Sequence, residues 1–229
     1  MIDEVFSAYF VLIVGFIVFF AANISISKIS KQTASLSGEI IYLSRSNKVL
    51  LFLVSQSASF VLFYYYGFSL TYFILLALLF SLIVVTVIDY NYRIVPNIFP
   101  ALLILCGLLL CAFNEVLGYS LFERFLNSIA GIICGGVLLF IFEFIGRIIY
   151  KQDVLGGGDI KLMASIGSII GFNKILIAIF TGFLLGAVIG FFLIILKKAD
   201  RKGYMPFVPF LAAGTYISLF CPNISFFVL

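Results

Sequence analysis

Histidine and tryptophan are both absent from this sequence of 229 residues. The lack of histidine removes the commonest metal ligand and the commonest general base of enzymes. Cysteine is scarce: the four cysteines all fall inside apolar segments and form no Cys-x-x-Cys pair. This pattern argues against structural zinc and predicts that the cysteines are small buried hydrophobes. We therefore expect a protein that uses no metal and no other cofactor.

Charged residues are also scarce, at 10% of the chain against about 25% in soluble domains. Hydrophobic residues make up 64%, which excludes a soluble globular protein. The net charge is only +4, and no run of Lys and Arg is dense enough to follow a phosphate backbone. Nucleic acid is therefore not an expected partner. The composition predicts an integral membrane protein that is surrounded by the lipid bilayer.

Apolar runs recur along the chain, at 5–24, 49–66, 70–88, 97–113, 125–149, 160–172, 174–196 and 206–221. A membrane-spanning helix needs roughly 20 residues, so most runs qualify and the 160–172 run predicts a partly embedded helix. We predict an all-α polytopic membrane protein with about eight transmembrane or partly embedded helices; seven, or six plus re-entrant segments, are the alternatives. The polar 25–48 segment predicts a loop, with a short interfacial helix inside it as the alternative, and Gly171-Phe172-Asn173 predicts a turn. The acidic N-terminus predicts that the first run is kept as an anchor.

Lysine and arginine gather on alternate predicted loops, at 25–48, 89–96, 147–161 and 197–204. Loops rich in Lys and Arg face the cytoplasm in most membrane proteins. This sorting predicts that both termini lie outside. It also places the loops that hold Asp89 and Asp159 on the cytoplasmic side.

Asp159 follows three glycines in the segment Gly156-Gly157-Gly158-Asp159-Ile160-Lys161-Leu162. A carboxylate at membrane depth is costly and indicates function, although Asp159 could instead only cap the next helix. The glycines accept positive φ angles and let another backbone approach closely. Asp89 ends the 70–88 run, one predicted out-and-back hairpin before Asp159. We therefore expect the two aspartates on the same side of the membrane and adjacent in space.

A close pair of carboxylates predicts acid–base chemistry that needs neither a metal nor a nucleophilic side chain. One ionised aspartate takes a proton from water, and the other, protonated, polarises a carbonyl group. The dipole at a helix N-terminus favours the charge of Asp159, whereas the C-terminal end of a helix disfavours that of Asp89. Our hypothesis is that Asp159 is the base and Asp89 the acid.

Several weaker candidates lie next to these two motifs. Pro96 and Asn97 follow Asp89 and begin the next predicted helix. Lys161 either anchors the helix at the interface or biases the charge of the aspartate pair. Asp153 either lines the site or caps a loop.

Glu143 lies late in an apolar run and is predicted to pair with Arg147, four residues further on. Pro206, Phe207 and Pro209 open the last run. We interpret these three residues either as a helix kink or as part of a substrate groove.

Ile88-Asp89, Ile94-Val95-Pro96-Asn97, Gly156 to Leu162 and Pro206 to Leu211 occur in this order and together resemble the type IV prepilin peptidases. These are intramembrane aspartyl proteases with a Gly-x-Gly-Asp motif, and the likeness covers roughly residues 80–215. It implies one membrane-embedded peptidase domain over 1–229. Within it, 1–68 would hold divergent N-terminal helices and a cytoplasmic loop, and 69–221 the catalytic core. Asp89 and Asp159 match the catalytic aspartates of the family.

The resemblance implies a multi-pass hydrolase of the cell (inner) membrane whose active site faces the cytoplasm. Its substrates would be type IV prepilins or pseudopilins of a pilus, secretion or competence system. The short basic leader would be cut off after a glycine, ahead of the apolar segment. The 25–48 segment lacks the paired cysteines that many members carry there, which are associated with N-methylation. The resemblance therefore extends to the peptidase and leaves methylation in doubt.

Four other interpretations stay open at the level of sequence. One is an archaeal preflagellin peptidase, which shares the aspartates. Another is a relative of presenilin or signal peptide peptidase, although those enzymes hold their aspartates deeper within helices. A third is an ion- or proton-coupled transporter that uses both aspartates, since glycine-broken helices with carboxylates serve that role. The last is an inactive scaffold of a pilus-assembly machine.

Overall fold

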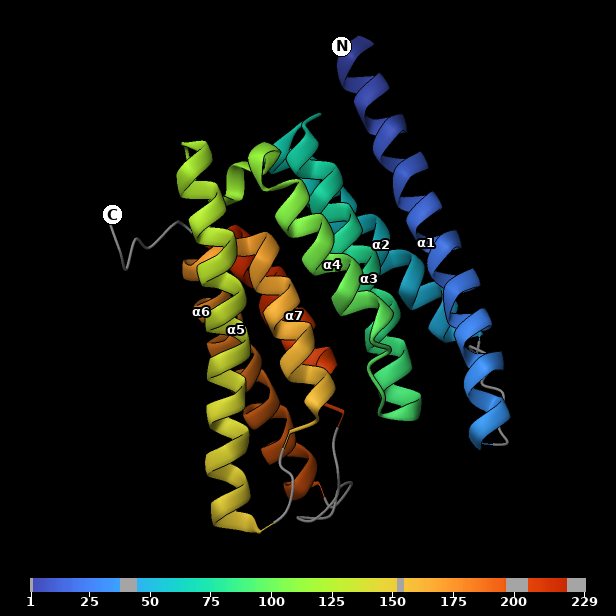
Figure 1. Ribbon diagram of the computed structural model, residues 1–229. Helices are drawn as coiled ribbons and strands as arrows, with labels where there is room; N and C mark the ends of the chain where they lie inside the picture. Colours follow the sequence, from blue (N-terminus) through green and yellow to red (C-terminus); the bar gives the residue numbers. More distant parts are fainter. Residues whose placement is uncertain (1, 38–44, 152–154, 197–205, 222–229) are drawn as a thin grey trace. The chain divides into compact units, whose positions relative to one another are not determined.

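The computed structural model describes residues 2–37, 45–151, 155–196 and 206–221. All regular elements in these ranges are helices, which confirms the predicted all-α class (Figure 1). The chain divides into two compact units, Met1–Asn91 and Tyr92–Leu229. We describe each unit by itself.

The chain is a multi-pass membrane protein, as its composition predicts. In the described ranges, five helices are long and apolar enough to cross a membrane, and two shorter helices are also apolar. The five candidate spans are Tyr9–Lys31, Asn47–Tyr66, Leu70–Tyr92, Leu121–Tyr150 and Gly157–Ile195. The side chains on the outer faces of these helices are largely Phe, Leu, Ile and Val, which suits contact with lipid.

The first unit consists of three helices, α1 (Ile2–Ser37), α2 (Arg45–Tyr66) and α3 (Leu70–Tyr92). Helices α1 and α2 pack through Phe19 and Phe52, whose rings meet edge to face with centroids 5.3 Å apart. Helices α2 and α3 are joined by a buried hydrogen bond of 3.0 Å between the hydroxyls of Ser59 and Tyr72. Ring packing and a buried polar pair therefore contribute to holding this unit together.

Helix α1 is longer than the sequence predicts. The expected apolar run ends at residue 24 and the expected loop covers 25–48, but the helix continues to Ser37 and α2 begins at Arg45. Much of the predicted loop is therefore helical. The physical reason is that residues 25–37 contain no glycine or proline, and the first glycine after the apolar run is Gly38. Polar side chains alone do not end a helix.

The second unit contains α4 (Ile98–Leu109), the short 3₁₀ helices η1 (Cys111–Phe113) and η2 (Glu115–Leu117), α5 (Leu121–Tyr150), α6 (Gly157–Ile195) and α7 (Val208–Phe220). Gly171 divides α6 into two helical segments, because its φ of 76° and ψ of 178° are not helical. Gly171 lies beside Asn127 of α5, and the Phe183 ring lies 5.0 Å from that of Phe142. The second segment of α6, 172–195, therefore runs parallel to α5.

The first segment of α6, 157–170, runs antiparallel to α5, and glycines make that packing close. A Cβ atom at Gly131 would collide with the carbonyl oxygen of Gly167, and one at Gly135 would collide with that of Met163. This Gly-x-x-x-Gly spacing lets two membrane helices approach backbone to backbone. Helix α6 is therefore a hairpin that turns at Gly171 (Figure 1), which confirms the two separate runs predicted for 160–172 and 174–196.

Helix α4 is shorter than the predicted run of 97–113. It has 12 residues, or about 18 Å at 1.5 Å per residue, and ends at Leu109 before η1 and η2. Polar side chains support the non-helical chain that follows. The Asn114 amide donates to Ile169 O at 2.8 Å, and the Arg124 Nε donates to Gly118 O at 2.8 Å. The first bond ties this chain to the first segment of α6, and the second ties it to the start of α5, so the polar side chains satisfy a carbonyl of α6 and a carbonyl of this chain.

Candidate active site

Asp159 lies in the first turn of α6, as the sequence predicts. Gly156 is the N-cap residue of this helix, and the Asp159 amide donates to Gly156 O at 3.0 Å. The side chain is largely enclosed, with 8% of the residue exposed. A carboxylate at this position is stabilised by the unpaired amides and the dipole of the helix N-terminus.

The three glycines before Asp159 serve different purposes, and positive φ is not among them. The described glycines with positive φ are Gly67, Gly118 and Gly171. Gly158 is required for space, because a Cβ there would lie 2.8 Å from the Cβ of Val95. At Gly157, by contrast, an added Cβ would meet nothing within 4 Å. The expected close approach is therefore made by the Val95 side chain at Gly158. The expected left-handed conformation of the three glycines is wrong.

The segment that contains Pro96 and Asn97 packs against the Asp159 motif. Lys161 Nζ donates to Asn97 Oδ1 at 3.2 Å, and Val95 contacts Gly158. Asn97 is the N-cap residue of α4, and the Pro96 carbonyl accepts from the Phe99 amide at 3.2 Å. Two of the predicted motifs are thus in contact on both sides of Asp159.

Asp89 lies in the last turn of α3, which ends at Tyr92. It is buried, with 6% of the residue exposed. The predicted location at a helix C-terminus is therefore confirmed. Asp89 belongs to the first compact unit and Asp159 to the second, and their pairing stays a prediction.

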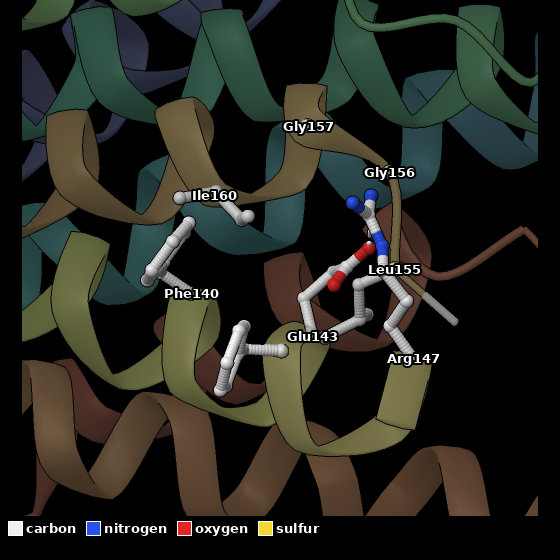
Figure 2. A pocket seen from close by; sticks show the side chains of 8 residues that line it. Phe140, Glu143, Arg147, Leu155, Gly156, Gly157 and Ile160 are labelled. Atoms are coloured by element: carbon white, nitrogen blue, oxygen red, sulfur yellow. Dashed lines mark hydrogen bonds and ion pairs between the residues drawn. The ribbon is translucent and has the colours of Figure 1, made fainter. Parts of the chain in front are cut away.

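A cavity of about 370 Å³ lies beside the glycines (Figure 2). It is lined by residues from the second half of α5, from the chain that leads into α6 and from the first turn of α6, namely Phe140, Glu143, Phe144, Arg147, Leu155, Gly156, Gly157 and Ile160. The predicted i,i+4 pair is present in its wall, since Arg147 Nη2 lies 3.1 Å from Glu143 Oε1. The Glu143 side chain is 9% exposed and that of Arg147 is 61% exposed.

Pro206, Phe207 and Pro209 lie at the start of α7, which begins at Val208. Pro209 is in the first turn, where proline fits a helix, so the prolines cause no kink within it. The Phe207 ring packs 5.0 Å from that of Phe183 in α6. These residues are not among those that line the cavity, and their role in a substrate groove stays a prediction. Asp153 lies outside the described residues.

Lys174 is a polar residue whose role the sequence analysis missed. It is buried, and its Nζ donates to the carbonyl oxygens of Ser218, Leu219 and Cys221 at 3.2–3.3 Å. A cation at the C-terminal end of α7 satisfies carbonyls that the helix leaves unpaired. The signal was present in the sequence, because a lysine inside an apolar run requires buried partners.

The fold and the site define a class of protein: a multi-pass α-helical membrane protein with a Gly-x-Gly-Asp motif at the start of a helix. A family model described as the type IV leader peptidase family matches residues 76–191. The chain belongs to this family. The match includes Asp89, Pro96, Asn97 and the whole Asp159 motif.

Curated relatives carry the name prepilin leader peptidase/N-methyltransferase. The protein from Stutzerimonas stutzeri is 25% identical over 156 residues, which cover 68% of this chain and 52% of the relative. That from Bacillus subtilis (strain 168) is 29% identical over 172 residues, covering 71% and 62%. That from Vibrio cholerae is 32% identical over 99 residues, covering 43% and 37%. The chain thus spans about half the length of the first of these relatives, and no solved structure matches it.

Proposed function

We propose that the protein is an aspartyl endopeptidase of the cell membrane that removes the leader of type IV prepilins or pseudopilins. Family membership supports this function, as do the names of the relatives. The observation that carries the proposal is the contact of Val95 with Gly158 and of Asn97 with Lys161. These contacts bring the chain that follows Asp89 onto both sides of Asp159.

Chain length supports the pairing of the two aspartates. Residues 90–94 are all that separates Asp89 from Val95. Six residue steps span at most about 20 Å even when fully extended. The covalent chain therefore holds Asp89 near the segment that contacts the Asp159 motif, which favours a shared site.

In the proposed mechanism, an ionised Asp159 takes a proton from a water molecule, and the water oxygen attacks the scissile carbonyl carbon. A protonated Asp89 donates a hydrogen bond to the carbonyl oxygen, where negative charge develops. The tetrahedral intermediate then breaks its C–N bond, and the proton taken from water passes to the leaving amine. Asp159 is proposed as the base because the helix N-terminus stabilises its charge.

The proposed location and specificity follow the charge pattern and the family. Lys and Arg gather on the loops next to Asp89 and Asp159, which favours a site on the cytoplasmic side of the membrane. The relatives' names combine leader peptidase with N-methyltransferase. The 25–48 segment of this chain contains no cysteine, and we propose the peptidase activity alone.

Co-expression with a panel of prepilins tests this function, with leader removal read from the mass of the product. Wild type is compared with Asp89→Asn and Asp159→Asn. Because acid–base catalysis contributes about 10²–10⁴-fold, each variant should lose at least about 100-fold in cleavage rate. Asp3→Asn in α1 makes the same chemical change elsewhere and should cleave like wild type.

Protein levels in the membrane must be equal for all variants. A wild-type rate of leader cleavage in Asp89→Asn or Asp159→Asn would contradict the two-aspartate mechanism. The mass of the mature N-terminus also reports methylation in the same samples, and a methylated product would contradict a peptidase-only protein.

A further inference from the structure

Helix α3 holds a buried hydroxyl group that the fold does not explain. The Thr86 Oγ1 atom is buried and has no hydrogen-bond partner among the residues that the structure describes. The hydroxyl of Ser81, on the same helix, donates to Ala77 O at 2.9 Å. The equivalent bond from Thr86 would go to Leu82 O, four residues earlier, and it is not made. A buried hydroxyl without a partner is unfavourable for the fold, so its presence requires another reason.

The place of this hydroxyl in the chain suggests that reason. In the described ranges, the other buried side-chain oxygens without a partner are the amide oxygens of Gln56 and Asn173. Gln56 lies on α2, and Asn173 follows Asp159 by 14 residues, beyond the turn of α6. Thr86, by contrast, precedes Asp89 by three residues. The unsatisfied hydroxyl is thus one helical turn from a residue proposed to be catalytic.

Thr86 and Asp89 are neighbours on one face of α3. Both lie inside the helix, where residues three apart have Cβ atoms about 5–6 Å apart. Helical side chains lean toward the N-terminus of their helix, so the Asp89 side chain extends over the turn that contains Thr86. The residue four positions before Asp89 is Val85, which is apolar and fully buried. Of these two neighbours, Thr86 is therefore the one that can bind the Asp89 carboxyl group.

Both groups are also shielded from water, since the Thr86 Oγ1 atom is buried and only 6% of Asp89 is exposed. On the basis of the proposed peptidase function, we propose that Thr86 is a positioning residue for Asp89. When substrate is bound, the Thr86 hydroxyl donates a hydrogen bond to one oxygen of the Asp89 carboxyl group. The other oxygen, which carries the proton, is then directed at the scissile carbonyl. Catalytic hydrogen bonds often form fully only in the substrate complex.

This role predicts that stability and rate change in opposite directions. Thr86→Val replaces the hydroxyl by a methyl group of similar size and removes an unsatisfied buried polar atom. The midpoint of thermal unfolding in detergent should therefore rise by about 3 °C. The rate should fall, because the acid is held less well in the reactive orientation. A group retained for packing would instead lower the midpoint when it is removed.

The kinetics of leader cleavage test the proposal with one prepilin that wild type cleaves. Thr86→Val should lower kcat by about tenfold and leave KM unchanged, because the lost interaction is made only in the transition state. Thr86→Ser keeps the hydroxyl and should recover most of the wild-type kcat. Ser81→Ala is the matched control: it also removes one hydroxyl from α3, but from a side chain that already has a partner, and it should cleave like wild type.

A wild-type kcat in Thr86→Val would overturn the positioning role while the peptidase function stands. A higher KM at unchanged kcat would also overturn it, because the hydroxyl would then bind the substrate instead of orienting Asp89. A loss of kcat that Thr86→Ser does not recover, or a lower unfolding midpoint in Thr86→Val, would assign the effect to packing and contradict the proposal. A wild-type protein that cleaves no prepilin in the panel would overturn the proposed function as well.

Discussion

The two ends of the second unit are built in opposite ways. At the end where α6 turns, polar side chains bind backbone carbonyls: Asn114 binds Ile169, Arg124 binds Gly118, and Lys174 binds the end of α7. At the other end, the chain before α6 borders a cavity of about 370 Å³. One end is closed by hydrogen bonds, and the other keeps open space beside Gly156 and Gly157, which precede Asp159.

This difference shows how a membrane protein can hold a site open without losing its fold. The closed end and the glycine crossing between α5 and α6 supply the rigidity. The open end can then expose the Gly157 backbone and keep a carboxylate in the first turn of a helix. Rigid elements that support a less satisfied site are the usual arrangement in enzymes. Variants of the glycine crossing and of Lys174 test the rigid part of the unit, and variants of Gly158 and Lys161 test the open end.

The largest expected effect is the loss of the glycine crossing. Gly131→Ala places a Cβ against the carbonyl oxygen of Gly167, so the two helices must separate. We expect a loss of about 3 kcal/mol in unfolding free energy, because overpacking against backbone is not relieved by a side-chain rotation. Thermal unfolding in detergent can be followed by the reaction of a maleimide dye with the buried thiols of Cys111 and Cys134.

Gly136→Ala is the matched control for this change. Gly136 lies on the same helix, and an added Cβ there would be 3.4 Å from the Cβ of Ala164, which is an ordinary van der Waals contact. Its unfolding should change by less than about 0.5 kcal/mol. Equal stability of Gly131→Ala and Gly136→Ala would contradict the close backbone packing.

Lys174→Met should have the next largest effect. Methionine matches the apolar stem but leaves the carbonyls of Ser218, Leu219 and Cys221 without their common donor. Hydrogen bonds to a charged group contribute about 1.5–3 kcal/mol, so we expect a loss of about 2 kcal/mol in the same unfolding assay. Lys174→Arg, which keeps the charge, should recover part of it. Wild-type stability of Lys174→Met would show that the bonds add nothing to the fold.

Much of the fold follows from the sequence, because the run of apolar residues is the dominant signal in a membrane protein. The hairpin in α6 is an example: Gly171-Phe172-Asn173 interrupts an otherwise continuous apolar stretch, and the chain turns at Gly171. Helix ends in polar segments are less predictable. The extension of α1 to Ser37 was missed because Ser, Lys and Gln are compatible with helix and nothing before Gly38 stops it.

The candidate site is predictable in its residues and less so in its contacts. The places of Asp89 and Asp159 at helix ends follow from the boundaries of apolar runs. The contact of Val95 with Gly158 does not, because it depends on how α4 and α6 pack, which a linear pattern does not encode. The same holds for the cavity, whose walls come from α5 and α6 together.

At the open end, Gly158→Ala should lower activity more than stability. Its Cβ would lie 2.8 Å from that of Val95, and Asp159 is the next residue, so relief of this contact shifts the carboxylate. Small misplacements of a reacting group cost up to about 100-fold in rate, and we expect a loss of roughly tenfold or more in prepilin cleavage. The expected loss in unfolding free energy is about 1 kcal/mol.

Gly157→Ala provides the comparison for stability, since its added Cβ would meet nothing within 4 Å. It should unfold no more easily than wild type. Val95→Gly combined with Gly158→Ala should recover activity relative to Gly158→Ala alone, because it removes the Val95 Cβ and Cγ2 atoms, which would lie 2.8 and 3.1 Å from the added Cβ. Absence of any recovery in the double variant would argue that Gly158 matters for a reason other than Val95.

The smallest effect is expected from the hydrogen bond between Lys161 and Asn97, which is exposed and 3.2 Å long. A double-mutant cycle of Lys161→Met and Asn97→Ala should give a coupling energy of about 0.5 kcal/mol or less, because exposed polar pairs gain little over water. Cleavage rates then show whether Lys161 acts only by holding the α4 segment through Asn97 or through its charge on the aspartate pair, which is one of the two roles predicted from the sequence. If it only anchors the α4 segment, both single variants lower the rate equally. If its charge acts on the aspartate pair, Lys161→Met lowers the rate well below Asn97→Ala and Lys161→Arg restores it.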